Sequence, residues 1–350
     1  MHTITVSHPN GKYPILIGEG LLAQAGDLLV RAGFQGRCAV VTNPTVGRHY
    51  ADPLLTGLQT AGLDPVRIDI PDGEPYKTLD TVAQLYRNLV EAGLDRRSPI
   101  LALGGGVLGD TAGFAAATYL RGVPLVQIPT TLLAMVDSSV GGKTGVDLPQ
   151  GKNLVGAFKQ PEMVLVDPAV LATLPAAEFR AGMAEVIKHG IIDAPALFES
   201  LEAGRYDQTW MLAEAIQVKV RVVQEDPFEQ GRRAVLNLGH TFGHAFERLS
   251  DYTIRHGEAV AMGTVCAARL AVRLDLCPPD TADRITRLLA RTGLPTEPPP
   301  YAPDEVLAAM ATDKKRRGRQ LRFVLPRGIG DVDVFADIPE AEVKAVLGEG

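Results

Sequence analysis

The chain has 350 residues, a formal net charge of −6, 46% hydrophobic residues and 22% charged residues. This composition is typical of a globular protein, and the length predicts two domains. The negative charge argues against a nucleic-acid-binding surface. No apolar run reaches the ~18 residues of a membrane-spanning helix, so we expect no membrane partner.

The N-terminal segment "MHTITVSHPNGKYPILIG" predicts two strands around the turn "HPNGK". It has no charged start followed by a long apolar stretch, so we expect no signal peptide. The three cysteines, Cys38, Cys266 and Cys277, share no metal-ligand spacing and form no even disulfide framework. Cys38 and Cys266 lie in apolar surroundings and should be small core residues. A reducing cytoplasm fits this cysteine usage.

Strand and helix patterns then alternate through the first half of the chain. The predicted strands are "RCAVVTN", the start of "VRIDIPDGEP", "PILALGG" and "PLVQIPTT". The predicted helices between them are "GRHYADPLLTGLQTAG", "TLDTVAQLYRNLVEAG" and "DTAGFAAATYL". Such alternation predicts an α/β domain with a mostly parallel, Rossmann-like sheet that is covered by helices on both faces.

From "LPAAEFRAGMAEVIKHG" onward, helical patterns follow one another, with breaks at Gly190, Gly204, Pro227 and "CPPD". We therefore place a domain boundary near residue 175. Residues 1–175 should form the α/β domain and residues 176–350 a mainly α-helical domain. The prolines of "PTEPPPYAP" predict a short stiff linker.

A glycine-rich stretch, "ILALGGGVLGDTAGFAA", places Gly104, Gly106 and Gly109 in a G-x-G-x-x-G pattern between a strand and a helix. A helix N-terminus in this context offers N–H donors and a positive dipole end to a pyrophosphate. A tight turn alone would also explain the glycines. The next strand ends in Thr130 and Thr131, without the acidic residue of an ordinary Rossmann fingerprint. A dinucleotide site therefore stays open at this stage.

A second stretch, "VDSSVGGKTGVDLPQGKN", predicts a polar loop whose "GKT" imitates the end of a P-loop. Asp137 stands where the P-loop needs a glycine, which excludes that nucleotide-binding motif. Lys143 and Lys152 suit an anionic ligand, although surface lysines are common. The basic run "DKKRRGR" at residues 313–319 has a solvated loop as its simplest interpretation.

Acidic and histidine residues with helical spacing stand in the second half. "AEVIKHG" places Glu185 and Lys188 at i, i+3 on one helix face, where a salt-bridged surface would be the ordinary interpretation. Asn237, His240 and His244 follow at intervals of three and four, which predicts side chains that project the same way from one helix.

Three of the chain's seven histidines lie in "NLGHTFGHAFERLSDYTIRHGEA", and His256 is the third. Such a group is compatible with a divalent metal held by two or three histidines and one acid. Thr241 interrupts the H-E-x-x-H pattern, which excludes a zinc protease. Spacing alone does not select the ligands.

In combination, several motifs closely resemble those of 3-dehydroquinate synthases, and the resemblance runs from "PDGEPYKT" to "LRFVLPRGIG". These motifs are "LGGGVLGDTAGFAAATYLRG", "QIPTTLLAMVDSSVGGKTGV", "GKNLVGAFKQP", "AGMAEVIKHG", "LNLGHTFGHAFE", "HGEAVAMG" and "DKK". The family is related to the iron-type alcohol and glycerol dehydrogenases. The resemblance therefore implies a glycerol-dehydrogenase-like architecture, with an NAD-binding first domain and a metal- and substrate-binding second domain.

The resemblance also implies a reaction. The family converts 3-deoxy-D-arabino-heptulosonate 7-phosphate to 3-dehydroquinate and phosphate, in the shikimate pathway of aromatic amino acid biosynthesis. Oxidation at C5 by NAD⁺ acidifies the C6 proton, phosphate leaves by β-elimination, and NADH returns the hydride. Ring opening and an intramolecular aldol closure follow. The implied cofactors are NAD and a divalent metal, with zinc first and cobalt as an alternative.

Carried over position by position, the family's metal ligands are Glu185, His240 and His256. A further group would bind substrate and move protons, with Asp137 beside the metal and Arg121 reaching in from a neighbouring subunit of a homodimer. Its other members are Lys143, Lys188, Lys219, Arg233, Asn237, His244 and one lysine of the "DKK" run, Lys314 or Lys315. The resemblance therefore replaces the interpretation of residues 313–319 as a solvated loop with the expectation that they bind the substrate phosphate.

The family's NAD-binding positions fall in six segments of this chain. Asp110 would hold the ribose on the nicotinamide side. The implied residues are Asp72, Gly73, Glu74, Pro75, Tyr76, Lys77, Gly106, Val107, Leu108, Gly109, Asp110, Thr130, Thr131, Lys143, Lys152, Val170, Leu171, Ala172 and Thr173. One departure is Pro227, where many members carry glutamate, in a loop that we expect to lie outside the pocket.

Three alternatives accompany this hypothesis. A related sugar phosphate cyclase, such as 2-deoxy-scyllo-inosose synthase, would share the fold, the cofactor and the first steps. Arg233, Asn237, His244 and the "DKK" run favour the heptulosonate phosphate. A polyol dehydrogenase would need no anion clamp, and a non-catalytic NAD-binding or metal-storage protein would not need the complete set of candidate residues.

Overall fold

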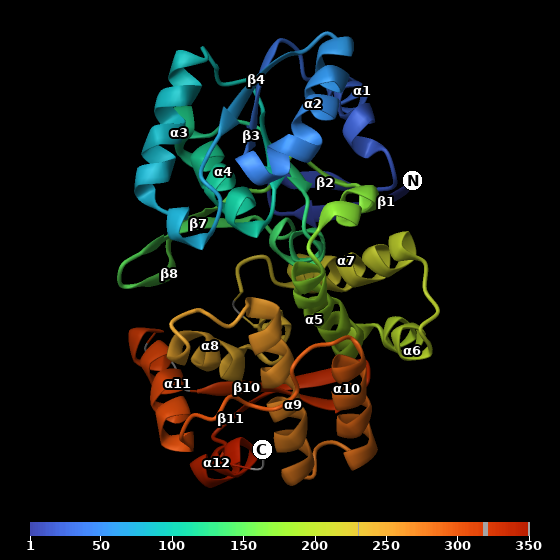
Figure 1. Cartoon of the computed structure of the whole chain (residues 1–350), viewed down its shortest axis with the longest axis vertical. Coiled ribbons are helices and arrows are strands. Elements are labelled where there is room, and N and C mark those ends of the chain that lie inside the picture. The colour runs from blue at the N-terminus through green and yellow to red at the C-terminus, as the bar shows by residue number, and fades with distance from the viewer. Residues whose placement is uncertain (230, 318–320, 349–350) are drawn as a thin grey trace. The chain divides into compact units, whose positions relative to one another are not determined.

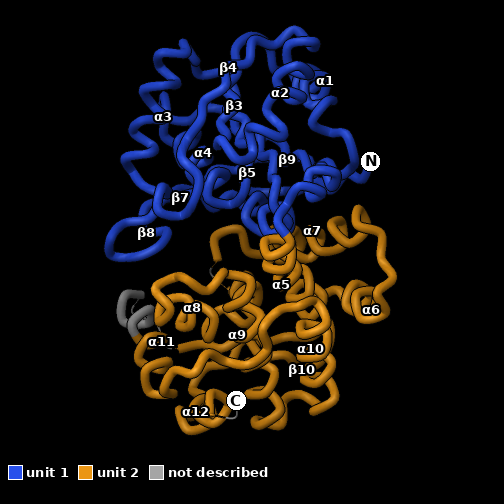
Figure 2. Tube along the Cα trace, viewed as in Figure 1, with its two compact units in different colours: residues 1–175 blue, residues 176–350 orange. Residues whose placement is uncertain are grey.

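The structure is a computed structural model that describes residues 1–229, 231–317 and 321–348, without the side chains of residues 312–317. The chain forms two compact units, Met1–Pro175 and Ala176–Gly350 (Figure 2). None of the helices in the described ranges combines the length and the hydrophobicity that crossing a bilayer requires.

A seven-stranded sheet forms the centre of the first unit, in the order β1-β2-β9-β6-β5-β3-β4. Only β1 and β2 pair antiparallel, and all other neighbours are parallel. The mostly parallel sheet is therefore confirmed, as is the N-terminal strand pair. The strands are β1 (His2–His8), β2 (Gly11–Ile17), β3 (Arg37–Thr42), β4 (Asp64–Asp69), β5 (Ile100–Gly104), β6 (Leu125–Pro129) and β9 (Met163–Val166).

Helices cover both faces of this sheet (Figure 1). The connection from β3 to β4 moves one way across the sheet, and the connections from β4 to β5 and from β5 to β6 move the other way. Right-handed crossovers then place α1 and α2 on one face and α3 and α4 on the other. The helices are α1 (Leu21–Arg31), α2 (Pro44–Thr60), α3 (Leu79–Glu91), α4 (Gly106–Thr118) and the short turns η1 (Glu74–Tyr76), η2 (Tyr119–Arg121), η3 (Ala134–Ser138) and η4 (Pro168–Thr173).

The stretch predicted as a polar loop after β6 is instead largely ordered, so that prediction was wrong. After η3 it forms an antiparallel hairpin of β7 (Lys143–Leu148) and β8 (Gly151–Phe158). Gly145 and Gly156 face each other across this hairpin, and a Cβ on Gly156 would lie 2.4 Å from the Thr144 carbonyl oxygen. The glycines that looked like loop residues therefore permit a close approach of two strands.

The helix that follows the glycine-rich turn ends earlier than the sequence predicts. We expected it to continue through "ATYL", but α4 ends at Thr118 and the turn η2 follows. Leu120 and Arg121 both have left-handed backbone angles, with φ of 49° and 69°. Residues with long side chains rarely adopt this conformation, so the direction of Arg121 is set by a strained turn and not by a helix end.

The second unit is mainly helical, and α9 lies at its centre, packed against α5, α8 and α10 (Figure 1). Its elements are α5 (Ala176–Asp193), α6 (Pro195–Ala203), α7 (Gln208–Glu225), η5 (Arg232–Asn237), α8 (His240–Leu249), α9 (His256–Arg273), α10 (Pro279–Arg291), α11 (Pro303–Arg317), β10 (Arg322–Gly328), β11 (Asp331–Ala336) and α12 (Glu340–Gly348). The antiparallel pair β10–β11 was not predicted.

The helix break predicted at Gly190 is also wrong. Gly190 lies inside α5, where a Cβ would be 3.1 Å from the Cβ of Phe198 in α6. Glycine at this position lets α5 and α6 approach each other and does not end the helix.

All three cysteines are buried free thiols, as expected for Cys38 and Cys266. Burial raises the pKa of each of these two thiols to about 12. Only roughly one ten-thousandth of such a thiol is ionised at pH 8, and the thiolate is the reactive form.

We therefore predict that none of the three cysteines reacts with iodoacetamide at pH 8 while the protein is folded. All three should react in the same time after unfolding in guanidinium. Mass spectrometry of the two samples counts the modified thiols. Rapid alkylation of Cys38 or Cys266 in the folded protein would contradict the burial described here.

Candidate metal centre and nucleotide-binding edge

Three potential metal ligands of the second unit come from three separate helices. Glu185 lies in the middle of α5, and His240 and His256 are the first residues of α8 and α9. One ligand atom from each residue lies within 4.8 Å of the others. Two imidazoles and a carboxylate at this spacing form a donor set that suits a divalent cation.

Glycines let the backbones of these helices approach closely enough to bring the three side chains together. A Cβ on Gly257, next to His256, would lie 2.0 Å from the Ala181 carbonyl oxygen of α5. A Cβ on Gly263 of α9 would lie 2.1 Å from the carbonyl oxygen of Gly239, which directly precedes His240. No larger side chain fits at either position, so these contacts fix where α8 and α9 begin relative to α5.

Hydrogen bonds on one side of each imidazole leave the other side facing Glu185. His240 Nδ1 lies 3.1 Å from the Leu238 carbonyl oxygen, and His256 Nδ1 lies 3.2 Å from Glu247 Oε1. The two Nε2 atoms lie 3.8 Å and 3.6 Å from Glu185 Oε1. A carbonyl or carboxylate on the far nitrogen is the usual arrangement around histidines that bind metals.

The carboxylate of Glu185 has the properties expected of a metal ligand. It is completely buried, and neither oxygen takes part in a hydrogen bond with a described group. Lys188 forms an ion pair with Glu185 Oε2. Ligands of one tetrahedral zinc ion are about 3.4 Å apart, and the imidazole nitrogens lie close to this spacing from Oε1. The residues present therefore fit a divalent metal.

The charges of this cluster depend on one another. Burial opposes ionisation of Glu185, but Lys188 and the two imidazoles outweigh it and hold the pKa of the carboxyl well below its usual range. Burial and Lys188 hold the pKa of His240 well below its usual value. Burial also disfavours the charged form of His256, but Glu185 and Glu247 outweigh it and raise its pKa to about 10. The cluster thus provides a carboxylate beside a neutral imidazole.

His244 lies one helical turn after His240 and is exposed. Its ring meets that of His240 edge-on, with centroids 5.2 Å apart. His244, Glu247 and His256 form a second group whose ligand atoms also lie within 4.8 Å of one another. His256 therefore belongs to two candidate groups, one on each side of its ring.

Two features of the histidine stretch were not predicted correctly. Asn237 does not project from the helix of His240 and His244, because it ends η5 and Gly239, with φ of 78°, separates it from α8. Glu247 was missed, although its spacing of seven from His240 and three from His244 places it on the same helix face. Helical periodicity was the signal that could have found it.

In the first unit, the glycine-rich turn lies at the carboxyl ends of the central strands. β5 ends at Gly104 and α4 begins at Gly106. The backbone N–H of Thr130, just after β6, donates to the Gly104 carbonyl oxygen at 2.9 Å. A Cβ on Gly105 would lie 3.1 Å from Thr131 Cγ2. This edge of a parallel sheet is where α/β proteins commonly bind ligands.

The other predicted nucleotide-binding segments follow β4 and β9 and end at the same edge. Asn43 caps α2 and also donates from Nδ2 to Asp72 Oδ1 at 2.9 Å. The Tyr50 hydroxyl donates to the Val170 carbonyl oxygen at 2.8 Å. The structure therefore brings the predicted segments of the first unit to one edge of its sheet.

Lysine contacts tie the β7–β8 hairpin to this edge. Lys77 Nζ donates to Asp110 Oδ2 and to Asn153 Oδ1, each at 2.6 Å. Lys152 Nζ lies 3.0 Å from Glu74 Oε1. Burial raises the pKa of Asp110, and Lys77 opposes that shift. Asn153 was not among the predicted nucleotide-binding residues, and its link to Lys77 depends on the hairpin.

The remaining predicted substrate residues differ in exposure. Lys188, Lys219 and Arg233 are buried polar residues, whereas Arg121 and Lys143 are exposed. Asp137 lies in η3 and is half-buried. The side chains of Lys314 and Lys315 fall outside the described residues.

Arg233 is held by the loop that contains Pro227. Its Nη1 donates to the Pro227 carbonyl oxygen at 2.8 Å, and its backbone N–H donates to Asp226 Oδ2 at 3.0 Å. Pro227, the departure noted in the sequence, therefore lies next to a candidate substrate residue.

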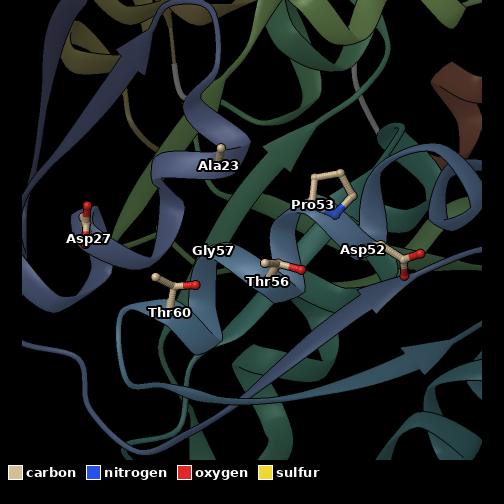
Figure 3. Close-up of a pocket in the computed structure, with 7 residues that line it drawn as sticks. All are labelled: Ala23, Asp27, Asp52, Pro53, Thr56, Gly57 and Thr60. Carbon is tan, nitrogen blue, oxygen red and sulfur yellow. The ribbon is translucent and has the colours of Figure 1, made fainter.

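A surface hollow lies between α1 and α2, and none of these candidates lines it (Figure 3). The two helices approach closely there, since a Cβ on Gly26 would lie 2.2 Å from the Gly57 carbonyl oxygen. The lining residues are Ala23, Asp27, Asp52, Pro53, Thr56, Gly57 and Thr60. None of them was predicted to have a functional role, and the hollow is a consequence of helix packing.

Fold and site together define the class of protein. A mostly parallel sheet with a glycine-rich turn, followed by a helical unit with a histidine–carboxylate cluster, is the architecture of the dehydrogenase-like sugar phosphate cyclases. The models for the 3-dehydroquinate synthase N-terminal and C-terminal regions match residues 67–181 and 182–316. The chain belongs to the 3-dehydroquinate synthase family.

Relatives of similar length carry this name. The chain is 48% identical over 358 residues to the 3-dehydroquinate synthase of Synechococcus sp. (strain ATCC 27144 / PCC 6301 / SAUG 1402/1), covering 98% of this chain and 97% of that protein. It is 47% identical over 359 residues to that of Desulforamulus reducens (strain ATCC BAA-1160 / DSM 100696 / MI-1), covering all of both chains.

Solved structures of related cyclases share the fold. ValA, a 2-epi-5-epi-valiolone synthase from Streptomyces hygroscopicus subsp. jinggangensis 5008 with NAD⁺ and Zn²⁺ bound, has a TM-score of 0.88 at 31% identity, covering 96% of this chain and 95% of that one. A 2-deoxy-scyllo-inosose synthase with carbaglucose-6-phosphate, NAD⁺ and Co²⁺ has a TM-score of 0.89 at 28% identity over all of both chains.

A more distant likeness concerns the fold alone. A probable glycerol dehydrogenase from Sinorhizobium meliloti 1021 has a TM-score of 0.62 at 18% identity, covering 95% of this chain and 94% of that one. The predicted glycerol-dehydrogenase-like architecture is thereby confirmed.

We predict that Gly257→Ala separates α9 from α5, because the new methyl group would overlap the Ala181 carbonyl oxygen. Overpacking of this kind costs about 1–3 kcal/mol of folding stability. Affinity for Zn²⁺ should fall as well, since His256 moves with its neighbour.

Thermal unfolding and zinc titration of the metal-free protein measure both effects. Gly328→Ala is the matched control, because a Cβ there meets nothing within 4 Å. Equal behaviour of the two variants would show that the α5–α9 contact does not position the site.

Proposed function

We propose that the chain converts 3-deoxy-D-arabino-heptulosonate 7-phosphate to 3-dehydroquinate and inorganic phosphate, in the shikimate pathway. The observation that carries this proposal is the 48% identity to a 3-dehydroquinate synthase along nearly all of both chains. The convergence of Glu185, His240 and His256 supports it. The reaction is a phosphate elimination between two opposite hydride transfers, followed by ring opening and aldol closure.

In this proposal, Glu185, His240 and His256 hold a divalent metal, and His244 stays outside the ligand set. The bound metal supplies Lewis-acid polarisation of substrate hydroxyls. Two features support this choice of ligands: the buried Glu185 Oε1 atom, which has no hydrogen bond to a described group, and the far-side hydrogen bonds that turn both Nε2 atoms toward Glu185. His244 is exposed, which suits a residue that meets substrate and transfers protons.

The substrate carries a carboxylate and a phosphate and therefore needs several cations. We assign this role to the lysines and the arginine carried over from the family, together with Asn237. Lys188, Lys219 and Arg233 are buried, and a cation that is shielded from water attracts an anionic group more strongly, which supports their assignment. The full set is Lys143, Lys188, Lys219, Arg233, Asn237, His244, Asp137 and a lysine among Lys314 and Lys315.

The first unit, residues 1–175, is proposed as the NAD-binding domain and residues 176–350 as the metal- and substrate-binding domain. NAD⁺, when bound there, would supply a reversible hydride acceptor for the substrate. The turn at Gly106–Asp110 would receive the pyrophosphate, and Asp110, held by Lys77, would bind the ribose. The three buried free thiols support a cytoplasmic location.

The alternative substrate class is that of 2-deoxy-scyllo-inosose synthase. The structural likeness to that enzyme is high, but the identity is 28%, against 48% for the 3-dehydroquinate synthase of Synechococcus. The retained Arg233 and Asn237 also favour the heptulosonate phosphate. A panel of sugar phosphates that includes glucose 6-phosphate separates the two substrates, with phosphate release as the readout.

We predict that NAD⁺ is required for phosphate release and is not consumed. The oxidation and the reduction lie on either side of the elimination, so the cofactor returns to its starting state in each cycle. Phosphate release and absorbance at the NADH wavelength are followed together, with enzyme stripped of NAD⁺ as the control. One equivalent of NADH for each phosphate released would replace the synthase proposal with a dehydrogenase.

We also infer that the working unit is a homodimer in which Arg121 completes the phosphate pocket of the neighbouring subunit. Arg121 is exposed on a strained turn, and a planar guanidinium binds phosphate with two parallel hydrogen bonds. Leu120, Leu154 and Phe158 are large exposed hydrophobic residues of the same unit, which supports a self-association surface.

Mixed dimers test this sharing. Subunits with only Arg121→Ala are combined with subunits with only Lys143→Ala. If Arg121 acts across the interface, one site of the mixed dimer has both defects and the other has none. Activity of verified mixed dimers should then recover to about half of wild type, whereas both parent dimers stay inactive. No recovery would show that Arg121 serves its own subunit or neither site.

A further inference from the structure

Glu247 contacts His256 on the side of the ring that faces away from Glu185. Its Oε1 lies 3.2 Å from His256 Nδ1, while His256 Nε2 lies 3.6 Å from Glu185 Oε1. Glu247 is buried on α8, and His256 begins α9, so the contact joins two helices. An imidazole that binds a metal through Nε2 gives up the proton there and keeps the one on Nδ1, so an acceptor at Nδ1 suits a ring whose Nε2 is the metal-binding atom.

His240 is oriented in a different way. Its Nδ1 faces the Leu238 carbonyl oxygen at 3.1 Å, so the main chain fixes this ring. His256 has a side-chain carboxylate in the equivalent position. No side-chain substitution removes the hydrogen-bond acceptor that orients His240, whereas the acceptor that orients His256 is lost when Glu247 is replaced by an apolar residue.

We propose that Glu247 is a positioning residue that fixes the ring orientation and tautomer of His256 for a divalent metal shared with Glu185 and His240. This inference rests on the proposed metal site. It goes beyond that site by naming the residue that orients the His256 ring so that Nε2 can bind the metal. Glu247 itself stays outside the ligand set.

A second arrangement of the same residues competes with this one. His244, Glu247 and His256 Nδ1 could themselves surround an ion. Three observations favour the first arrangement. Glu247 already pairs with the Nδ1 atom that would have to bind the ion, His244 is exposed, and Oε1 of the completely buried Glu185 has no hydrogen bond to a described group.

The test compares two substitutions of nearly equal size in the full-length protein after removal of metal with a chelator. Glu247→Gln keeps an oxygen that accepts from Nδ1–H, and Glu247→Met removes the acceptor. Zinc affinity is measured by competition with a chromophoric chelator. Loss of such an orienting partner weakens metal binding by about 10–100-fold. We expect that loss for Glu247→Met, whereas Glu247→Gln should retain most of the affinity.

Further readouts separate positioning from a structural role. If Glu247 only joins α8 to α9, both variants change the thermal unfolding temperature and bind zinc as tightly as wild type, which overturns the proposal. If the competing arrangement holds the ion, His244→Ala and Glu247→Gln both lose zinc as strongly as Glu247→Met, which also overturns it. We expect His244→Ala to leave zinc affinity unchanged.

The wild-type protein supplies an independent check that requires no folded variant at position 247. In zinc-loaded protein with ¹⁵N-labelled histidine, the His256 signals should report a protonated Nδ1 and a metal-bound Nε2. His256→Gln assigns these signals. A protonated Nε2 would overturn the proposal. Absence of zinc binding by wild type would instead refute the metal site itself, so the two failures are distinguishable.

Discussion

The close approach of α9 to α5 and α8 is the constraint on which the candidate metal centre depends. Gly257 and Gly263 of α9 meet main-chain carbonyl oxygens of α5 and of the segment before α8. Because backbone meets backbone, side-chain repacking cannot change these distances appreciably. The starts of α8 and α9 are thereby fixed near the middle of α5, where Glu185 lies. The three potential ligands converge for this reason, although as many as 71 positions separate Glu185 from His256 in the chain.

The charges at this centre do not serve stability. A buried carboxylate, a buried lysine and two imidazoles cost more to remove from water than apolar residues of the same volume, and such ion pairs are often neutral or unfavourable for folding. Glu185 and Lys188 lie inside a helix whose buried residues are otherwise mostly apolar. The close backbone contacts of α9 hold these charged groups together although their burial is unfavourable. A buried charged cluster that adds little to folding and yet is held so firmly is best explained by what it binds.

Much of the fold followed from local patterns in the sequence. Strand and helix periods predicted β3 to β6 and the helices between them, because a buried parallel sheet has continuous apolar strands. The metal ligands did not follow from spacing, which left the choice among the histidines open until the family resemblance was considered. Glu185 and Lys188 also looked like a solvated ion pair, since one helix face does not reveal which other helices cover it. Burial on all sides is a property of the assembled unit.

Glycine explains two of the places where prediction from sequence failed. The same residue opens the turn at Gly104–Gly106, lets β7 approach β8 at Gly145 and Gly156, and brings α6 against α5 at Gly190. From the sequence alone, glycine indicates a flexible backbone. It therefore predicted a turn at Gly104–Gly106, a loop at Gly145 and Gly156, and a helix break at Gly190. Only the first prediction is correct, because at the other two places Gly145, Gly156 and Gly190 are needed for the close approach of a neighbouring element.

The error at the hairpin concerns the nucleotide-binding edge directly. Lys77 and Asn153 are 76 positions apart, and their hydrogen bond exists only because β7 and β8 form a hairpin instead of a loop. That hairpin carries Asn153 to a lysine that also neutralises half-buried Asp110. A glycine pair that permits strand pairing therefore determines the electrostatic surroundings of a residue far away in sequence. Local patterns predicted the sheet edge, whereas the contacts that arrange charges along it depend on tertiary structure.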